Sequence, residues 1–218
     1  MARRALIVYG GWDGHQPREV AQVFERALRE DGFDVQLSDT LDSFADERSL
    51  RALSLIVPHW TMGTIRDDQL NPVLSAVRAG VGIAGCHGGM CDAFRDATEW
   101  HFMTGGQWVA HPGNDGTRYR VNVVPGRSPI TDGISDFDVV SEQYYMHVDP
   151  AVKVLATTRF PVADGPHVGN GPVDMPVLWT KAYGSGRVFY SSIGHTPAAV
   201  EAEPHLTLLR RGFRWAAA

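Results

Sequence analysis

The chain has 218 residues, enough for one α/β domain with a full hydrophobic core, and we expect a single domain over residues 1–218. Its apolar content of 44% and charged content of 21% are those of a globular protein, and a net charge of -5 without any basic cluster argues against nucleic-acid binding. No apolar stretch reaches the roughly 18 residues that a membrane span needs. We therefore expect a cytoplasmic protein with no nucleic-acid or membrane partner.

The first half of the chain alternates apolar strands with amphipathic helices. The predicted strands cover residues 5–9, 33–37, 53–57 and 81–85, and the predicted helices cover residues 18–31 and 67–79. Gly32 and Gly80 are placed to end the two helices. This alternation predicts a parallel sheet with helices on both faces, and right-handed crossovers bring every strand-to-helix loop to one edge.

The second half of the chain has a different pattern, in which apolar and polar residues alternate over short segments. Strands are predicted at residues 118–124, 137–140, 152–158, 177–181 and 186–192, with a hairpin turn at 183–185, a loop at 162–176 and a final helix at 205–215. We therefore predict a doubly wound, mostly parallel α/β sheet of flavodoxin-like type with antiparallel additions in the C-terminal half.

The most informative motif is Gly85-Cys86-His87-Gly88-Gly89, which follows a predicted strand and precedes a helical segment. Doubly wound enzymes place a nucleophile on such a strand-to-helix turn, because small neighbours let one side chain enter the crevice. Counted from Gly85 to Gly89, the motif puts His87 at the tip and points Cys86 toward the sheet. The frame from Ala84 to Gly88 would put Cys86 at the tip but lacks the first glycine, so we favour His87.

The two cysteines and the N-terminus carry less information. A bridge between Cys86 and Cys91 would be strained across a turn and a helix, and two thiols are too few for a zinc cluster. We expect both thiols to be reduced. The first strand begins within a few residues of the N-terminus, so no signal peptide is expected.

Histidine is the commonest metal ligand and titrates near neutral pH, so the placement of the nine histidines matters more. His15, His59, His87 and His195 each follow a predicted strand, and Glu142 follows the apolar pair at 139–140. Ligands bind at the carboxyl ends of strands in open α/β sheets. We therefore expect these imidazoles and this carboxylate to converge on one crevice.

The remaining histidines divide into candidates and packing residues. His111 lies in a glycine-rich segment, 105–112, which we interpret as a turn, and it joins the candidates. His59 stands between Pro58 and Trp60 and is expected to pack in the core. His205 begins the last helix and is expected to cap it or lie on the surface. Among the others, His147 is the best candidate because it comes five residues after Glu142.

These motifs together resemble the trehalose-utilisation (ThuA-like) family, whose fold is that of class I glutamine amidotransferases. The matching segments are the loop with His15, residues 85–89, 105–112 and 142–144, the run from 176 to 190, and Gly194-His195. Amidotransferases carry cysteine in G-x-C-x-G at the elbow and a late His-x-Glu pair. Here His195 is followed by Thr196-Pro197, so we expect no glutaminase activity.

The resemblance implies an enzyme of carbohydrate catabolism, a hydrolase, lyase or isomerase, acting on a sugar or keto-sugar derivative. His87, Glu142 and His195 are the expected acid–base residues. The same three residues with His15 would also suit a divalent metal, zinc first, and no nucleotide cofactor is expected. Trp60 is a further aromatic that could stack on a sugar ring. The expected substrate-binding residues are Trp12, Trp108, His111 and Tyr144.

Two other functions remain open at this point. The first is a non-catalytic module that binds a sugar or metabolite, although several ionisable groups in one crevice favour an enzyme. The second is a thiol-dependent amidase or hydrolase using Cys86, which requires an exposed thiol with a depressed pKa. The expected ligand is a sugar-like small molecule, and a homodimer is the usual default for oligomeric state.

Overall fold

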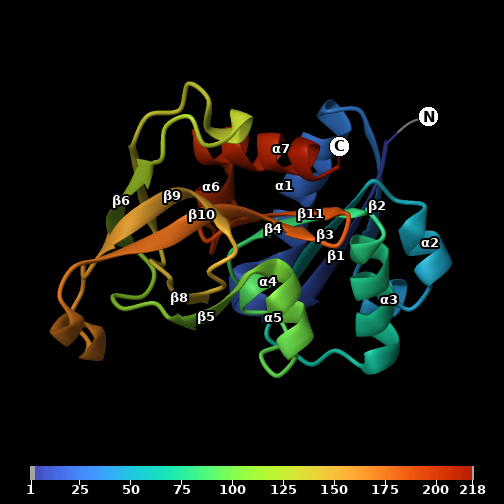
Figure 1. Cartoon of the computed structure of the whole chain (residues 1–218), viewed down its shortest axis with the longest axis horizontal. Coiled ribbons are helices and arrows are strands. Elements are labelled where there is room, and N and C mark those ends of the chain that lie inside the picture. Colours follow the sequence, from blue (N-terminus) through green and yellow to red (C-terminus); the bar gives the residue numbers. More distant parts are fainter. Residues whose placement is uncertain (1–2, 218) are drawn as a thin grey trace.

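A nine-stranded mixed sheet forms the centre of the protein, whose computed structural model describes residues 3–217 (Figure 1). Its strand order is β2-β1-β3-β4-β11-β10-β9-β6-β7. The first five strands in that order are mutually parallel: β2 (Phe33–Ser38), β1 (Arg3–Gly11), β3 (Leu55–Thr61), β4 (Gly82–Cys86) and β11 (Gly186–Ser191). The others join antiparallel: β10 (Val173–Tyr183), β9 (Lys153–Phe160), β6 (Thr117–Val123) and β7 (Phe137–Ser141). The predicted parallel sheet with antiparallel additions in the C-terminal half is confirmed.

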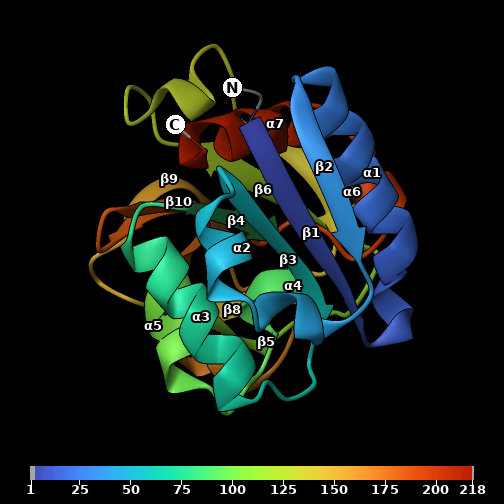
Figure 2. The same cartoon turned by 90° about the vertical axis from the view of Figure 1, so that its right-hand side faces the viewer.

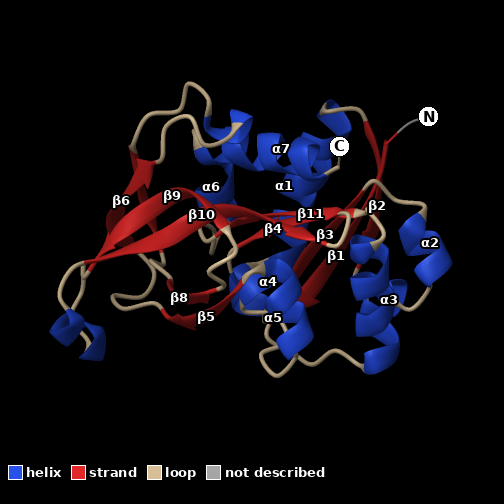
Figure 3. Cartoon of the chain, viewed as in Figure 1, coloured by secondary structure: helices blue, strands red, loops and turns tan. Residues whose placement is uncertain are grey.

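Helices cover both faces of this sheet, as Figure 3 shows with blue helices on either side of the red strands. One face carries α1 (Pro17–Glu30), α6 (Pro197–Glu201) and α7 (His205–Ala216). The other carries α2 (Glu47–Arg51), α3 (Asp67–Arg78), α4 (Gly88–Cys91) and α5 (Thr98–Thr104). Figure 2 shows β2, β1 and β3 next to one another with α2 and α3 nearby. No helix within residues 3–217 is long and apolar enough to cross a bilayer.

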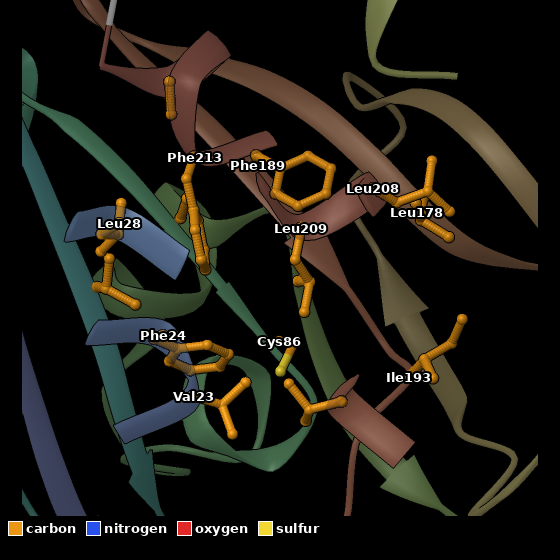
Figure 4. Close-up of a cluster of buried hydrophobic side chains, with 14 of the residues drawn as sticks. Val23, Phe24, Leu28, Cys86, Leu178, Phe189, Ile193, Leu208, Leu209 and Phe213 are labelled. Atoms are coloured by element: carbon orange, nitrogen blue, oxygen red, sulfur yellow. The ribbon is translucent and has the colours of Figure 1, made fainter. Parts of the chain in front are cut away.

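The core under α1 and α7 forms because each helix has one apolar face. Phe24 of α1 and Phe213 of α7 are both 0% exposed, and their rings meet edge to face at 5.4 Å. Figure 4 shows Cys86 among these side chains, close to Leu209. Cys86 therefore points from β4 into the core, as predicted.

The topology brings the end of β7 to the same edge as the ends of the parallel strands. Four antiparallel pairings lead from β11 to β7, so the two strands run in the same direction. The Ser141 hydroxyl donates a hydrogen bond of 2.7 Å to the carbonyl oxygen of Gly194, which joins the end of β7 to the segment after β11. Glu142 thus enters the crevice at the carboxyl ends of the parallel strands.

Three local predictions need correction. Residues 106–110 form a strand, β5 (Gly106–Ala110), paired antiparallel with β8 (Tyr145–Val148), where a glycine turn was expected. The expected loop at 162–176 holds a short 3-10 helix (Pro166–Asn170), and β10 begins within it at Val173, because β9 and β10 form a longer hairpin. His205 is 0% exposed and not on the surface, because Ser191 Oγ and the Ala199 carbonyl satisfy its two ring nitrogens.

Candidate metal centre and active site

His87 occupies the tip of the turn between β4 and α4. Its φ of 52° and ψ of -145° are rare for a residue with a side chain, and such strained backbone gathers at functional sites. The ring Nδ1 lies 2.9 Å from the carbonyl oxygen of Ser192, so Nδ1 carries the hydrogen and donates it. In the neutral ring the lone pair then belongs to Nε2.

Glu142 is the centre of the cluster and is only 5% exposed. Its Oε2 lies 3.1 Å from His87 Nε2 and 3.8 Å from His15 Nε2. Its Oε1 lies 3.5 Å from His195 Nδ1 and 3.7 Å from His111 Nδ1. The predicted convergence of His15, His87, His195 and Glu142 is confirmed, and it includes His111.

Two further contacts orient His15 and His195. His15 ends the 3-10 helix η1 (Asp13–His15), and its Nδ1 lies 2.8 Å from Thr61 Oγ1 at the end of β3. His195 has a left-handed φ of 81°, and its Nε2 lies 3.6 Å from Asp115 Oδ2. Both rings are thereby turned with a nitrogen toward Glu142.

The glycines of the two motifs permit this close packing. A Cβ on Gly88 would lie 2.7 Å from the ring of His15, and a Cβ on Gly194 would lie 2.4 Å from Cβ of His87. Side chains at these positions would displace the imidazoles. Gly88 and Gly194 are therefore needed because the segments that carry His15, His87 and His195 approach one another too closely for a larger residue.

At neutral pH, the protonation states of His87 and Glu142 place two hydrogen-bond acceptors opposite each other. Burial is the main reason that the pKa of His87 falls to about 4, so this ring is neutral. Burial favours the protonated form of Glu142, yet the imidazoles that surround it, His15 first among them, outweigh burial and lower the pKa of Glu142 well below its ordinary value. The Nε2 lone pair of His87 then faces an ionised carboxylate oxygen at 3.1 Å. Two acceptors at that distance repel unless a proton or a metal ion lies between them.

The residues fit a divalent metal ion. One ligand atom each from His15, His87, Glu142 and His195 lie within 4.8 Å of one another. Ligand atoms about 2.0–2.1 Å from a tetrahedral zinc stand roughly 3.3 Å apart, and the three nitrogens lie 3.1–3.8 Å from the Glu142 oxygens. His195 Nδ1 is buried without a hydrogen-bond partner among the described residues, as a metal-ligating nitrogen would be. An ion that accepts five or more ligands would leave a position for substrate.

The aromatic candidates take different positions. Trp12 is 45% exposed, with its ring 4.8 Å from that of His15, so it borders the cluster from outside. Trp108 is half-buried and lies 5.4 Å from the ring of His111. Tyr144 is only 2% exposed, and its ring stacks on His87 at 4.0 Å. As a correction, Tyr144 therefore packs beneath the cluster and offers no face to a sugar.

Other candidates lie outside the cluster. His147 is exposed on β8, and the contacts of Glu142 do not include it. His59 is buried as expected, against Phe24, and burial lowers its pKa to about 3. No local pattern in the sequence marks Thr61, Ser192 and Asp115, because each orients a histidine that is distant in sequence or acts through the folded backbone.

The family model described as trehalose utilisation, ThuA, matches residues 4–216. The chain belongs to the ThuA family. No curated protein matches this ThuA chain in sequence.

Solved structures resemble this ThuA chain along most of its length. A putative ThuA-like protein from Parabacteroides merdae is 19% identical with a TM-score of 0.79, covering 100% of this chain and 91% of that one. A cytoplasmic protein from Salmonella typhimurium LT2 is 13% identical with a TM-score of 0.69, covering 98% and 99%. A glutamine amidotransferase from Thermotoga maritima is 13% identical with a TM-score of 0.54, covering 88% and 75%. At these identities the likeness establishes the fold alone.

The thiol chemistry of amidotransferases does not carry over to this ThuA chain. Cys86 is 0% exposed, and burial raises the pKa of its thiol to about 12. A reactive cysteine needs exposure and a depressed pKa. The alternative of a thiol-dependent hydrolase using Cys86 is therefore corrected: β4 turns this side chain into the core, and His87 takes the tip of the turn.

Proposed function

We propose that this ThuA-family chain is a divalent-metal-dependent enzyme that acts on a sugar or keto-sugar derivative by acid–base chemistry. The carbohydrate role is supported by the family, whose description is trehalose utilisation. The metal is supported above all by the geometry, in which one ligand atom each from His15, His87, Glu142 and His195 comes within 4.8 Å of the others. The reaction class is a hydrolysis, elimination or isomerisation, and the compartment is the cytoplasm, that of the Salmonella relative.

In this proposal His15, His87, His195 and Glu142 hold the ion. Bound there, the ion supplies Lewis acidity that polarises a carbonyl or a hydroxyl pair of the sugar. The Ser192 carbonyl keeps the hydrogen of His87 on Nδ1, and Thr61 and Asp115 orient His15 and His195. Such outer contacts typically alter metal affinity by about 10–100-fold.

The sugar would lie on the exposed side of the cluster. Trp12 offers a partly exposed ring beside His15, and its apolar face suits the C–H face of a pyranose. His111 and Trp108 border the cluster near Glu142 Oε1. These residues would bind the ligand, and Tyr144 would support His87 from below.

Metal content is the direct test. The protein is purified without chelators or a nickel column, and its metal is measured by mass spectrometry. We expect about one zinc, manganese, iron or cobalt ion per chain. Glu142→Gln, which removes the charge at constant shape, and His87→Ala should lose the ion, whereas His147→Ala on the exposed side of β8 should retain it.

The competing function is a binding module without catalysis. Metal-free wild-type protein, with unaltered sugar affinity in Glu142→Gln, would support that alternative and contradict the enzyme. Circular dichroism of each variant separates loss of the ion from loss of the fold.

A further inference from the structure

His111 faces the cluster without belonging to the ligand set. Its Nδ1 lies 3.7 Å from Glu142 Oε1, on the same oxygen as His195. The four residues whose ligand atoms lie mutually within 4.8 Å do not include His111. It begins the loop between β5 and β6 that also carries Asp115.

The exposure of His111 differs from that of the other three imidazoles facing Glu142. Its side chain is 30% exposed, against 1% for His87, 4% for His15 and 13% for His195. Nevertheless its Nδ1 is buried and has no hydrogen-bond partner among the described residues. The ring therefore has one unpaired nitrogen beside the cluster and an edge in contact with solvent, which is what a group that exchanges protons requires.

A chain of contacts fixes the His111 ring in this position. Trp108 lies 5.4 Å from it at an interplanar angle of 33°, and the Trp108 Nε1 is also buried without a partner among the described residues. The guanidinium of Arg95 lies over the Trp108 ring at 4.6 Å. Asp92, which is 3% exposed, accepts hydrogen bonds of 2.6 and 3.0 Å from Arg95. The ring of His111 is thus supported through Trp108 by an ion pair between the partly exposed Arg95 and the buried Asp92, and is not a free surface side chain.

We propose that His111 is the residue that carries the proton of the reaction, while His15, His87 and His195 hold the ion. This inference rests on the proposed function. In a keto-sugar, the C–H bond next to the carbonyl breaks, its proton passes to Nε2 on the partly exposed edge of the His111 ring, since Nδ1 is buried against Glu142, and the electron pair moves onto the carbonyl oxygen. In an isomerisation the imidazolium returns the proton to the former carbonyl carbon, while the proton of the neighbouring hydroxyl moves to the former carbonyl oxygen and the carbonyl re-forms one carbon along. In an elimination the enolate electron pair restores the carbonyl and forms a C=C bond, the C–O bond to the leaving group breaks, and the imidazolium protonates the leaving oxygen.

The test combines metal content with proton exchange in His111→Ala. Wild-type protein is incubated in D₂O with ketohexoses and a keto-disaccharide, and proton NMR follows deuterium incorporation next to the carbonyl. We expect His111→Ala to retain about one ion per chain and to lose exchange by about 10²–10⁴-fold. Added imidazole should restore part of the rate in proportion to its concentration, because it replaces the missing ring. His147→Ala serves as the matched control with wild-type exchange.

The outcomes separate this inference from the proposed function. Loss of the ion in His111→Ala would make His111 a ligand and overturn the inference, while the metal centre would stand. Unchanged exchange, or a loss that imidazole does not rescue, would also overturn it. Wild-type protein without metal and without exchange on any of these sugars would overturn the proposed function, and the inference with it.

Discussion

At the scale of single residues, the chemistry depends on which ring nitrogen of His87 holds the hydrogen. A main-chain carbonyl decides this, because Ser192 accepts from Nδ1 and leaves Nε2 as an acceptor toward Glu142. A peptide carbonyl cannot become a donor, so this tautomer does not depend on any side chain. The lone pair of the neutral ring is therefore directed at the carboxylate, where a proton or a metal ion can bind between the two groups.

Gly194→Ala tests whether the segment after β11 must pack directly against His87. The added Cβ would meet Cβ of His87 at 2.4 Å, so the ring must move away from Glu142. We expect metal affinity to fall by at least about 10-fold, the scale seen when the support of a ligand is lost. Isothermal titration calorimetry measures it. Gly169→Ala is the matched control, since nothing lies within 4 Å of its added Cβ, and an affinity equal to wild type in both variants would contradict the argument.

At the scale of elements, the β4–α4 turn separates two side chains that are adjacent in sequence. Cys86 completes β4 and joins the core of Phe24, Phe213 and Leu209, whereas His87 faces the cluster. A strand alternates its side chains between faces, so one residue enters the core while the next emerges at the edge of the sheet. The glycine pattern predicts which of the two lies at the tip.

Thiol labelling tests this assignment. Burial raises the pKa of the Cys86 thiol to about 12 and raises that of Cys91 as well, so few thiolates exist at pH 8. We expect native protein to react with iodoacetamide at least about 100-fold more slowly than the urea-unfolded chain. Rapid labelling of native Cys86, identified by peptide mapping, would restore the thiol alternative.

At the scale of the whole molecule, buried neutral histidines make stability depend on pH. Burial is the main cause that lowers the pKa of His205 from 6.5 to about 4, and His205 joins α7 to β11 and α6 through Ser191 and Ala199. The unfolded chain therefore takes up a proton at a higher pH than the folded protein. The stability that His205 contributes is complete above pH 6.5 and is lost as the pH falls toward 4.

Urea unfolding between pH 7 and pH 4, with a chelator present so that no metal ion binds, measures this effect. We expect wild-type unfolding free energy to fall across that range, with up to roughly 3 kcal/mol from His205. His205→Gln should be less stable at pH 7 and should show a shallower pH dependence. The exposed variant His147→Gln should keep the wild-type slope, and parallel curves for all three proteins would rule out His205 as the cause.

Local patterns in the sequence determined most of the elements, though not β5, β8 or α2, together with the parallel and antiparallel halves and the edge at which the histidines lie. Hydrophobic periodicity and glycine placement act over short distances, which is why they are readable locally. They did not determine which nitrogen of His87 faces Glu142, that Tyr144 lies under His87, or that Asp115 reaches the cluster. Those features depend on how nine strands bring residues far apart in sequence together, and on burial, which sets tautomer and charge only once the chain is folded.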